Sequence, residues 1–387
     1  MTTRANDMSR SLAAFDEHST LVVVVEMGQK SWLVAGLIPG VERHPKKKMD
    51  PDPEKLFSLL ERWRGESVKA GRPITRIALA YEAGRDGFWL ARWLESRGIE
   101  THVIHSTSVA VSREKRRAKT DRVDAEMLLR VFLGWLRGER DHCSMVAVPT
   151  IEAEDDRRPG REREALVAER TRIINRMKAD MARLGVCGFK PYLRSAPKKL
   201  GSVRIAEGVA VPPNTKAELE RDMARLAVLR EQIAAIEQTR LKRIEATPDK
   251  GPHAMIRLLA RVRGLGIETA DMLVNEVMTR RLRDRRAVAR YAGITGSPEE
   301  SGKRRREKGL SKSGNARVRR GMIQLAWRWL TFQKESALVL WFMARVDGAP
   351  RLRKTMIVAL ARKLLIALWR MATIGEIPQG VVLRPAA

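Results

Sequence analysis

Two aspartates in the stretch KTDRVDAE (119–126) lie three residues apart, between the basic run SREKRRAK and the apolar run MLLRVFLGWL. Three residues is close to one helical turn, so Asp121 and Asp124 share one face of a predicted helix. Two further acids end apolar segments upstream, Glu26 in LVVVVE and Glu82 in ITRIALAYE. Converging carboxylates repel one another unless cations neutralise them, and divalent ions such as Mg²⁺ prefer oxygen ligands. The four acids therefore predict a Mg²⁺ site, with Mn²⁺ as a substitute, that acts on phosphodiester bonds.

Each acid taken singly also fits a simpler role. Acidic residues at strand ends and on helix surfaces are usually solvated, and Asp121 or Asp124 can neutralise nearby arginines such as Arg122. Glu26 argues for more, because VVVVE offers no other polar side chain and a carboxylate at the end of a buried strand normally has a use. The combination of four acids is more specific than any one of them.

The elements around these acids predict a mixed sheet flanked by helices. The β-branched run LVVVVE (21–26) predicts a buried strand, and SWLVAGLI (31–38) predicts its hairpin partner after the turn MGQK. Strands followed by α/β alternation indicate an α/β domain, expected at 18–145. The other expected elements are a helix at 53–64, a strand at 74–82, a helix at 88–98, a strand at 101–106 and the helix with Asp121 and Asp124.

Two long amphipathic helices are expected after a linker that contains EAEDD and flanking prolines. Apolar residues at heptad-like spacing lead to Gly185, a predicted helix stop, and TKAE (215–218) predicts a capping box that opens the second helix. Such a pair indicates a coiled-coil arm or dimerisation element at 161–246. Two ordinary helices packed on a core are the alternative.

The C-terminal part, 251–375, is expected to be an all-α domain. RVRGLGIETADMLVNEV (261–277) predicts two helices joined by a Gly-Leu-Gly turn, similar to a helix–hairpin–helix that presents backbone N–H groups to a phosphate. An ordinary interhelical turn fits these residues equally well. The surrounding arginines, Arg263 among them, favour contact with DNA.

Composition favours a nucleic-acid partner. The 387 residues include 75 Lys+Arg against 46 Asp+Glu, a net charge of +29, while 44% hydrophobic residues indicate a folded chain. Positive charge recurs in HPKKK, SREKRRAK, TRRLRDRR and GKRRREKG, as expected for contact with a long polyanion at many points. A ribosomal or merely soluble basic protein is the alternative.

Cysteine usage and hydropathy exclude several other classes. The two cysteines, Cys143 and Cys187, lie far apart and offer neither a disulfide framework nor a zinc site, which fits a reducing cytoplasm. The apolar run TMIVALARKLLIALWRMA (355–372) contains Arg362 and Lys363, so it predicts an amphipathic helix and no membrane span. The expected location is the cytoplasm.

Five segments carry a resemblance to a known family. VVVVEMGQKSWLVAG, ALAYEAGRDGFWLARWLESRG and KTDRVDAE are followed by LARVRGLGIETADMLVNEV and by AVARYAGITGSPEESGKRRREKGLSKSGNARVRRGMIQLAWRWL. This order resembles the bacterial insertion-sequence transposases of the IS-one-ten group, often called DEDD transposases, over nearly the whole chain. It implies an RuvC-like domain of RNase H fold, a coiled-coil insert and a helical transposase domain. The GxSK-GN-xR block is highly specific in that setting and comprises Gly309, Ser311, Lys312, Gly314, Asn315 and Arg317.

The resemblance also implies which residues act. Glu26, Glu82, Asp121 and Asp124 occupy the family's four acid positions, as metal ligands and catalytic groups. The family usually has Asp in the first strand, so Glu26 adds a methylene where catalytic geometry is sensitive to about 1 Å. The implied nucleophile is Ser301 in EESGKRRREKG, which would form a covalent phosphoserine with DNA. From the residues alone, Ser301 more simply begins a basic turn; the rival serines are Ser297, Ser311 and Ser313, of which Ser311 is expected to cap the next helix.

The implied function is a DNA transposase/recombinase that cuts and rejoins strands. By the resemblance it acts as a homo-oligomer (dimer or tetramer) on double-stranded DNA, guided by a structured non-coding RNA. The resemblance also implies a location in the bacterial cytoplasm, in association with the nucleoid. Two alternatives stay open: a hydrolytic RuvC-like junction nuclease that uses the four acids alone, and an inactive nucleic-acid-binding copy. The basic residues expected to contact nucleic acid are Lys115, Arg116, Arg117, Lys119, Arg263, Lys303, Arg304, Arg305, Lys312 and Arg317.

Overall fold

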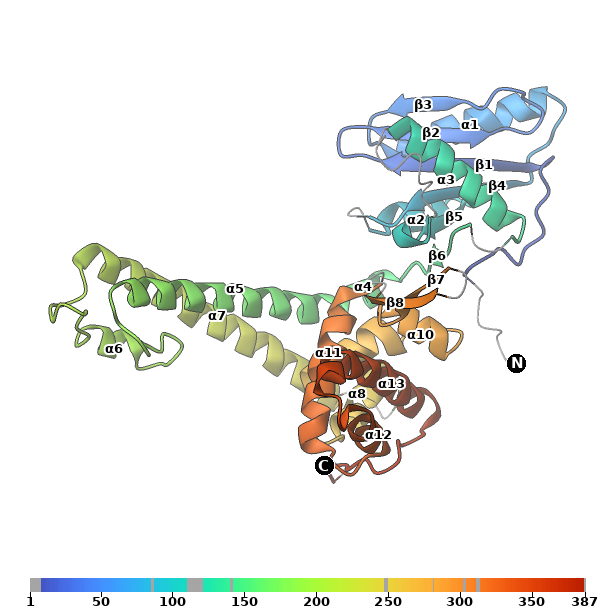
Figure 1. The fold of residues 1–387 in the computed structure, drawn as a ribbon. Helices are drawn as coiled ribbons and strands as arrows, with labels where there is room; N and C mark the ends of the chain where they lie inside the picture. The colour runs from blue at the N-terminus through green and yellow to red at the C-terminus, as the bar shows by residue number, and fades with distance from the viewer. Residues whose placement is uncertain are drawn as a thin grey trace. The chain divides into compact units, whose positions relative to one another are not determined.

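The computed structural model describes residues 8–84, 87–109, 121–139, 142–246, 250–280, 282–301, 304–310 and 314–385. For 121–124, 297–301 and 304–308 it describes the backbone alone. The chain divides into two compact units, Met1–Thr150 with Arg281–Asp284, and Ile151–Arg280 with Arg285–Ala387 (Figure 1). The long helices and the C-terminal helices both fall into the second unit.

The first unit is built on a six-stranded mixed sheet of order β3-β2-β1-β4-β5-β6. The central strands are parallel in the pairs β1–β4 and β4–β5, while β2, β3 and β6 join antiparallel. This confirms the predicted mixed sheet, with two edge strands that were not predicted. The strands are β1 (Thr20–Met27), β2 (Trp32–Leu37), β3 (Lys46–Met49), β4 (Arg76–Glu82), β5 (Glu100–Ile104) and β6 (Met145–Val146).

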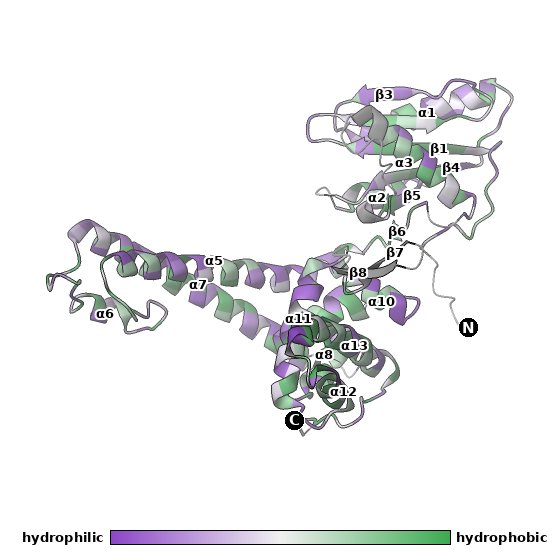
Figure 2. Cartoon of the chain, viewed as in Figure 1, coloured by the Kyte–Doolittle hydropathy of each residue, from purple (hydrophilic) through white to green (hydrophobic). Residues whose placement is uncertain are grey.

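Helices bury both faces of this sheet. Alternate residues of a strand point to opposite faces, so the valines of β1 serve two cores. Val23 and Val25 pack with α1 (Pro53–Lys69) and α2 (Trp89–Glu95), whereas Val24 packs on the other face with α3 (Asp121–Leu136). The central strand β1 is hydrophobic in Figure 2, whereas the edge strand β3, with sequence KKKM, is hydrophilic.

The second unit contains the two predicted long helices. They are α5 (Arg158–Arg183) and α7 (Pro213–Ala246), which pack side by side and extend from the remaining helices of this unit (Figure 1). Gly185, with a φ of 72°, follows the end of α5 as expected. The predicted capping box at TKAE was wrong, because α7 starts at Pro213, a residue suited to the first helical position. The expected linker is also partly helical, since it contains α4 (Ile151–Asp155); α6 (Ala196–Leu200) lies between the long helices.

In its described residues the C-terminal part is mainly helical, with one hairpin. Strands β7 (Gly296–Ser301) and β8 (Arg304–Leu310) pair antiparallel, so the all-α prediction was wrong here. Their register sets Glu299 opposite Arg306 and Glu300 opposite Arg305, and opposite charges at facing positions favour antiparallel pairing. In the described part of the chain no helix is both long and apolar enough to span a bilayer. The helices are α8 (Pro252–Ala260), α9 (Ile267–Leu273) with the π-helical segment Val274–Met278, α10 (Arg285–Tyr291), α11 (Ala316–Phe332), α12 (Ala337–Val346) and α13 (Arg353–Ile374).

Candidate active site

Glu26 and Glu82 lie side by side at the carboxyl ends of β1 and β4. The parallel register pairs Val25 with Tyr81, so the following residues of both strands are neighbours. Each glutamate lies two positions beyond a residue packed under α3, and therefore on the α3 face of the sheet. Both line a pocket of about 510 Å³ whose other lining residues are Met27, Gly28, Gln29, Tyr81, Ala83, Gly84, Gly87 and Ser106.

Two ion pairs fix the direction in which α3 crosses the sheet. Near the start of α3, Glu126 pairs with Lys46 of β3, a position level with Val24 near the end of β1. Just beyond the other end of α3, Arg137 pairs with Glu17, which precedes β1. The helix therefore runs antiparallel to β1, and its first turn lies at the sheet end where Glu26 and Glu82 lie.

That first turn contains the aspartates of the KTDRVDAE stretch. Asp121 and Asp124 precede Ala125 and Leu128 by four residues each, and both of those residues are buried against the sheet. Positions four apart share one side of a helix, so the backbone places all four acid positions at one end of the first unit.

A Mg²⁺ site at this end fits the donor atoms present. The side chains of Asp121 and Asp124 lie outside the described part of the chain, and among described side chains no cluster of three or more His, Cys, Asp or Glu could hold a metal ion. The pocket itself offers carboxylate oxygens from Glu26 and Glu82. Oxygen donors of this kind suit Mg²⁺, which keeps several waters and needs few protein ligands.

Ser301 is the last residue of β7. It pairs in register with Arg304, and Arg305 follows opposite Glu300. Ser301 belongs to the second unit and the four acids to the first. The predicted nucleic-acid contacts Lys115, Arg116, Arg117, Lys119, Lys303 and Lys312 lie outside the described residues, as do the rival serines Ser311 and Ser313.

Asn315 caps α11, so the prediction that Ser311 caps this helix was wrong. The helix begins at Ala316, and Asn315 Oδ1 accepts hydrogen bonds from the N–H groups of Arg317 and Val318 at 3.0 and 3.2 Å. Asparagine is among the best N-cap residues, and it stands directly before the helix.

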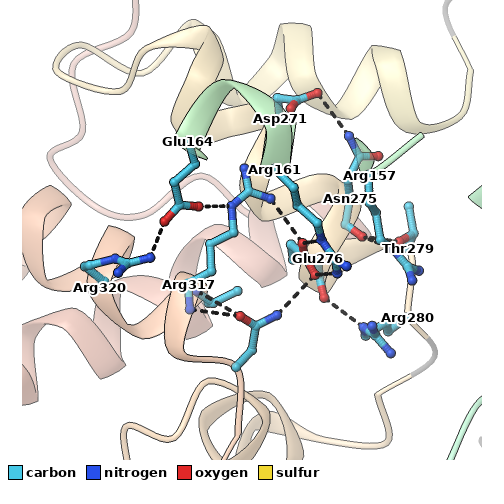
Figure 3. A network of polar contacts seen from close by, with 12 residues as sticks. Arg157, Arg161, Glu164, Asp271, Asn275, Glu276, Thr279, Arg280, Arg317 and Arg320 are labelled. Carbon is cyan, nitrogen blue, oxygen red and sulfur yellow. Dashed lines mark hydrogen bonds and ion pairs between the residues drawn. The ribbon is translucent and has the colours of Figure 1, made fainter. Parts of the chain in front are cut away.

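The two other described residues of the GN-xR part of the block also have structural roles. Gly314 has a φ of 105°, and a Cβ there would lie 2.5 Å from the carbonyl oxygen of Tyr291. Arg317 Nη1 donates to Glu276 Oε1 at 3.1 Å, and Arg317 Nε lies 2.7 Å from Glu164 Oε2 (Figure 3). This guanidinium, predicted to contact nucleic acid, is thus engaged by two carboxylates within the second unit.

The Gly-Leu-Gly turn is closely packed between helices. The Arg263 N–H donates to Val382 O at 3.0 Å, and Gln333 Nε2 donates to Arg263 O at 2.7 Å. Gly264 has a φ of 89°, and a Cβ there would lie 2.7 Å from Phe332 Cβ. These contacts account for the turn as an interhelical connection; its contact with phosphate stays a prediction.

Sequence reasoning did not find Glu276. It is 1% exposed and accepts hydrogen bonds from Arg161, Asn315 and Arg317. Burial by itself would raise the pKa of Glu276, but the hydrogen bonds and charges of Arg161 and Arg317 hold that pKa below its ordinary value. The only signal in the sequence is a single acid within the apolar run MLVNEVM.

A mixed sheet with acids at the carboxyl ends of its central strands, in a strongly basic chain, is typical of enzymes that act on nucleic-acid phosphodiesters. Comparison with known families identifies the class more closely. The DEDD transposase model of the IS110 group matches residues 26–184, and the model described as the Transposase IS116/IS110/IS902 family matches residues 256–339. The first match includes the four acid positions and the second includes Ser301.

One relative covers nearly the whole chain. The sequence is 40% identical over 379 residues, 94% of each protein, to "Putative transposase y4rJ" of Sinorhizobium fredii. No solved structure matches. The chain therefore belongs to the IS116/IS110/IS902 family of insertion-sequence transposases.

Proposed function

We propose that this transposase cuts and rejoins DNA with Ser301 as its nucleophile and with Glu26, Glu82, Asp121 and Asp124 as a Mg²⁺-binding group. The observation that supports this most is the acidic end of the first unit. Glu26 and Glu82 line one pocket there, and α3 begins at the same end. Carboxylates gathered in a chain of net charge +29 have an evident use if they hold cations while the basic residues hold the polyanion.

In the proposed cleavage step, Ser301 Oγ forms a bond to a backbone phosphorus and the bond from that phosphorus to a deoxyribose oxygen breaks. The serine proton passes to water, and the departing sugar oxygen takes a proton and leaves as a hydroxyl. Attack by the hydroxyl of another strand reverses these bonds and rejoins DNA without an external energy source. Mg²⁺, when bound, would stabilise negative charge on the phosphate oxygens.

The proposed partners follow from charge and from the family. The dispersed basic runs suit contact with the phosphates of double-stranded DNA and of a structured guide RNA, because phosphate contact needs cations more than aromatic rings, which are 5% of the chain. The α5–α7 pair is proposed to join copies of the chain into a homo-oligomer. RNA dependence is checked by comparing strand cleavage with and without RNA transcribed from the element's flanks.

The nucleophile is tested by trapping a protein–DNA adduct. Full-length protein is incubated with element-end DNA, flank-derived RNA and Mg²⁺, and a protein-linked strand is sought on a denaturing gel. We expect Ser301→Ala to abolish the adduct with DNA and RNA binding unchanged. Ser297→Ala is the matched control, because Ser297 lies in the same strand, β7, and should leave the adduct intact. An undiminished adduct in Ser301→Ala would refute the assignment.

The acids are tested separately from the serine. Glu82→Gln and Glu26→Gln should each stop cleavage in Mg²⁺ and in Mn²⁺, whereas the same change at Glu54, an exposed residue of α1, should not. Free cut ends without an adduct, unaffected by Ser301→Ala, would instead indicate a hydrolytic nuclease. Cleavage that appears only in Glu26→Asp would indicate an inactive copy whose first acid is one methylene too long.

A further inference from the structure

The buried carboxylate of Glu276 joins the start of α11 to the start of α5. Glu276 accepts hydrogen bonds from Arg161 Nε and Nη2 at 3.1 and 3.3 Å, from Arg317 Nη1 at 3.1 Å and from Asn315 Nδ2 at 3.1 Å. Figure 3 shows its side chain between those of Arg161 and Arg317. Four donated hydrogen bonds and two guanidinium charges satisfy a carboxylate that is almost fully buried.

The same asparagine closes the base of the β7–β8 hairpin. Tyr291 precedes β7 and Asn315 follows β8. The Asn315 N–H donates to the Tyr291 carbonyl oxygen at 2.6 Å, and Asn315 Nδ2 lies 3.0 Å from the Tyr291 hydroxyl, to which it donates. The Arg280 guanidinium lies 4.5 Å from the centre of the Tyr291 ring. The segments that lead into and out of the hairpin are thus joined at Tyr291 and Asn315, and the side-chain amide of Asn315 also donates to Glu276.

The backbone around Glu276 is unusual. It lies in the π-helical segment Val274–Met278, and short π-helical segments are rare and frequent at functional sites. Two arginines bond the carbonyl groups of this segment: Arg157 Nε donates to Asn275 O at 3.0 Å and Arg280 Nε donates to Glu276 O at 2.8 Å. Arg157, which directly precedes α5, and Arg280, which follows the π-helical segment, therefore fix the widened turn.

A glycine makes room for this arrangement. Gly160 is buried in α5, and a Cβ there would lie 2.9 Å from Arg317 Nη2 and 3.2 Å from Asp271 Oδ2. Glycine inside a helix costs about 1 kcal/mol relative to alanine, so a close approach is the physical reason for its use here. The first turn of α5 and the start of α11 therefore pack closely against each other.

We propose that Glu276 and Asn315 are positioning residues that fix the base of the β7–β8 hairpin and thereby the placement of Ser301 at its other end. This inference rests on the proposed role of Ser301. Because Arg161 belongs to α5, the same carboxylate also ties the hairpin base to the long helices. A displacement of α5 would therefore change the position of Ser301.

The test uses two small changes that spare the fold. Tyr291→Phe removes one hydroxyl, and Asn315→Ser keeps an oxygen that can cap α11 but loses the donating amide. In single-turnover reactions with saturating DNA, we expect Tyr291→Phe to slow adduct formation roughly 3- to 10-fold, the effect of one neutral hydrogen bond, and Asn315→Ser to slow it further. Tyr192→Phe, an exposed tyrosine between α5 and α7, is the matched control and should change nothing.

Hydrogen exchange separates positioning from simple stability and does not depend on catalysis. Each variant should speed amide exchange in 296–310 by a factor similar to that by which it slows adduct formation. The affinity for DNA should stay as in wild type. Unchanged hairpin exchange, even with a lower melting temperature, would overturn the proposal, and so would faster exchange with an unchanged adduct rate. A wild-type protein that forms no adduct, or one whose adduct survives Ser301→Ala, removes the proposed nucleophile instead, whatever the exchange data show.

Discussion

Replacing Glu276 with glutamine removes one buried charge and keeps the size of the side chain. The wild-type carboxylate is 1% exposed and neutralises Arg161 and Arg317. Glutamine keeps one acceptor oxygen, but it places an amide NH₂ where donors from Arg161 or Asn315 now point. The variant therefore loses an ion pair and places its amide NH₂ against another hydrogen-bond donor. Its free energy of unfolding should be lower than that of the wild type.

The structure sets the size of that fall. Breaking a buried ion pair by removing one partner typically costs about 3–5 kcal/mol. Two features reduce the loss here: the Arg161 side chain is 55% exposed and can be rehydrated, and Arg317 keeps Glu164 at 2.7 Å. We therefore expect Glu276→Gln to lower the free energy of unfolding of the second unit by about 2–4 kcal/mol at pH 7.

The dependence on pH has a definite sign. The pKa of Glu276 is lowered in the folded protein, so its contribution is fully present above the pKa of an unfolded glutamate, about 4.3, and is lost as pH falls through the lowered value. The difference between wild type and Glu276→Gln should accordingly shrink in acid. Urea unfolding across this pH range measures it, and hydrogen exchange of α5 and α11 assigns it to the second unit.

The control makes the same chemical change at an exposed carboxylate of this unit. Glu237 of α7 is 41% exposed and pairs with Arg163 at 2.6 Å. Exposed pairs contribute about 0–1 kcal/mol, so Glu237→Gln should have little effect. If Glu276→Gln loses no more stability than Glu237→Gln, the network in Figure 3 does not hold the unit together as argued.

Three further outcomes are expected. Gly264→Ala should destabilise by about 1–3 kcal/mol in urea unfolding, because its φ is 89° and its Cβ would meet the ring at the end of α11, whereas Gly266→Ala has open space and should be nearly neutral. The pKa of Glu100 is lowered to about 2, mainly by the hydrogen bond from His102 and, against the opposing effect of burial, by that from Arg76. The first unit of the wild type should therefore lose about 1–2 kcal/mol of stability, after screening, between pH 4.5 and 2. Glu100→Gln should not show this loss. Arg317→Gln should lower thermal stability yet leave the salt dependence of DNA binding unchanged, since removal of a charge that contacts one phosphate would reduce the slope by about one.

The sequence predicted those parts of the fold that depend on apolar pattern. The continuous run in β1 and the helical spacing of α1 and α3 are local signals of burial. The hairpin β7–β8 and the edge strand β3 were missed because their sequences, SPEES with RRREKGL and KKKM, are charged. Their pairing is set by neighbouring strands and by opposite charges across the register, which no single segment displays.

Of the acidic residues discussed above, some could be predicted from the sequence and one could not. Glu26 and Glu82 were predicted because each is the polar end of an apolar strand, and parallel strands bring such ends together. Glu276 could not be predicted, because its partner Arg161 lies 115 residues away and only the packed helices bring them into contact. Local patterns locate candidate groups, whereas a buried polar network is defined by the tertiary structure alone.

The contacts at the start of α11 give the residues of the GN-xR part of the block structural roles. Gly314 is required by a positive φ and close backbone, Asn315 by the helix cap and hairpin base, and Arg317 by two buried or half-buried carboxylates. Each residue is thus accounted for without a nucleic acid. Loss of transposition on changing any of them would follow from a displaced hairpin as readily as from a lost phosphate contact. Measurements that separate the two, namely salt dependence and hairpin exchange, therefore have to accompany any activity assay of this segment.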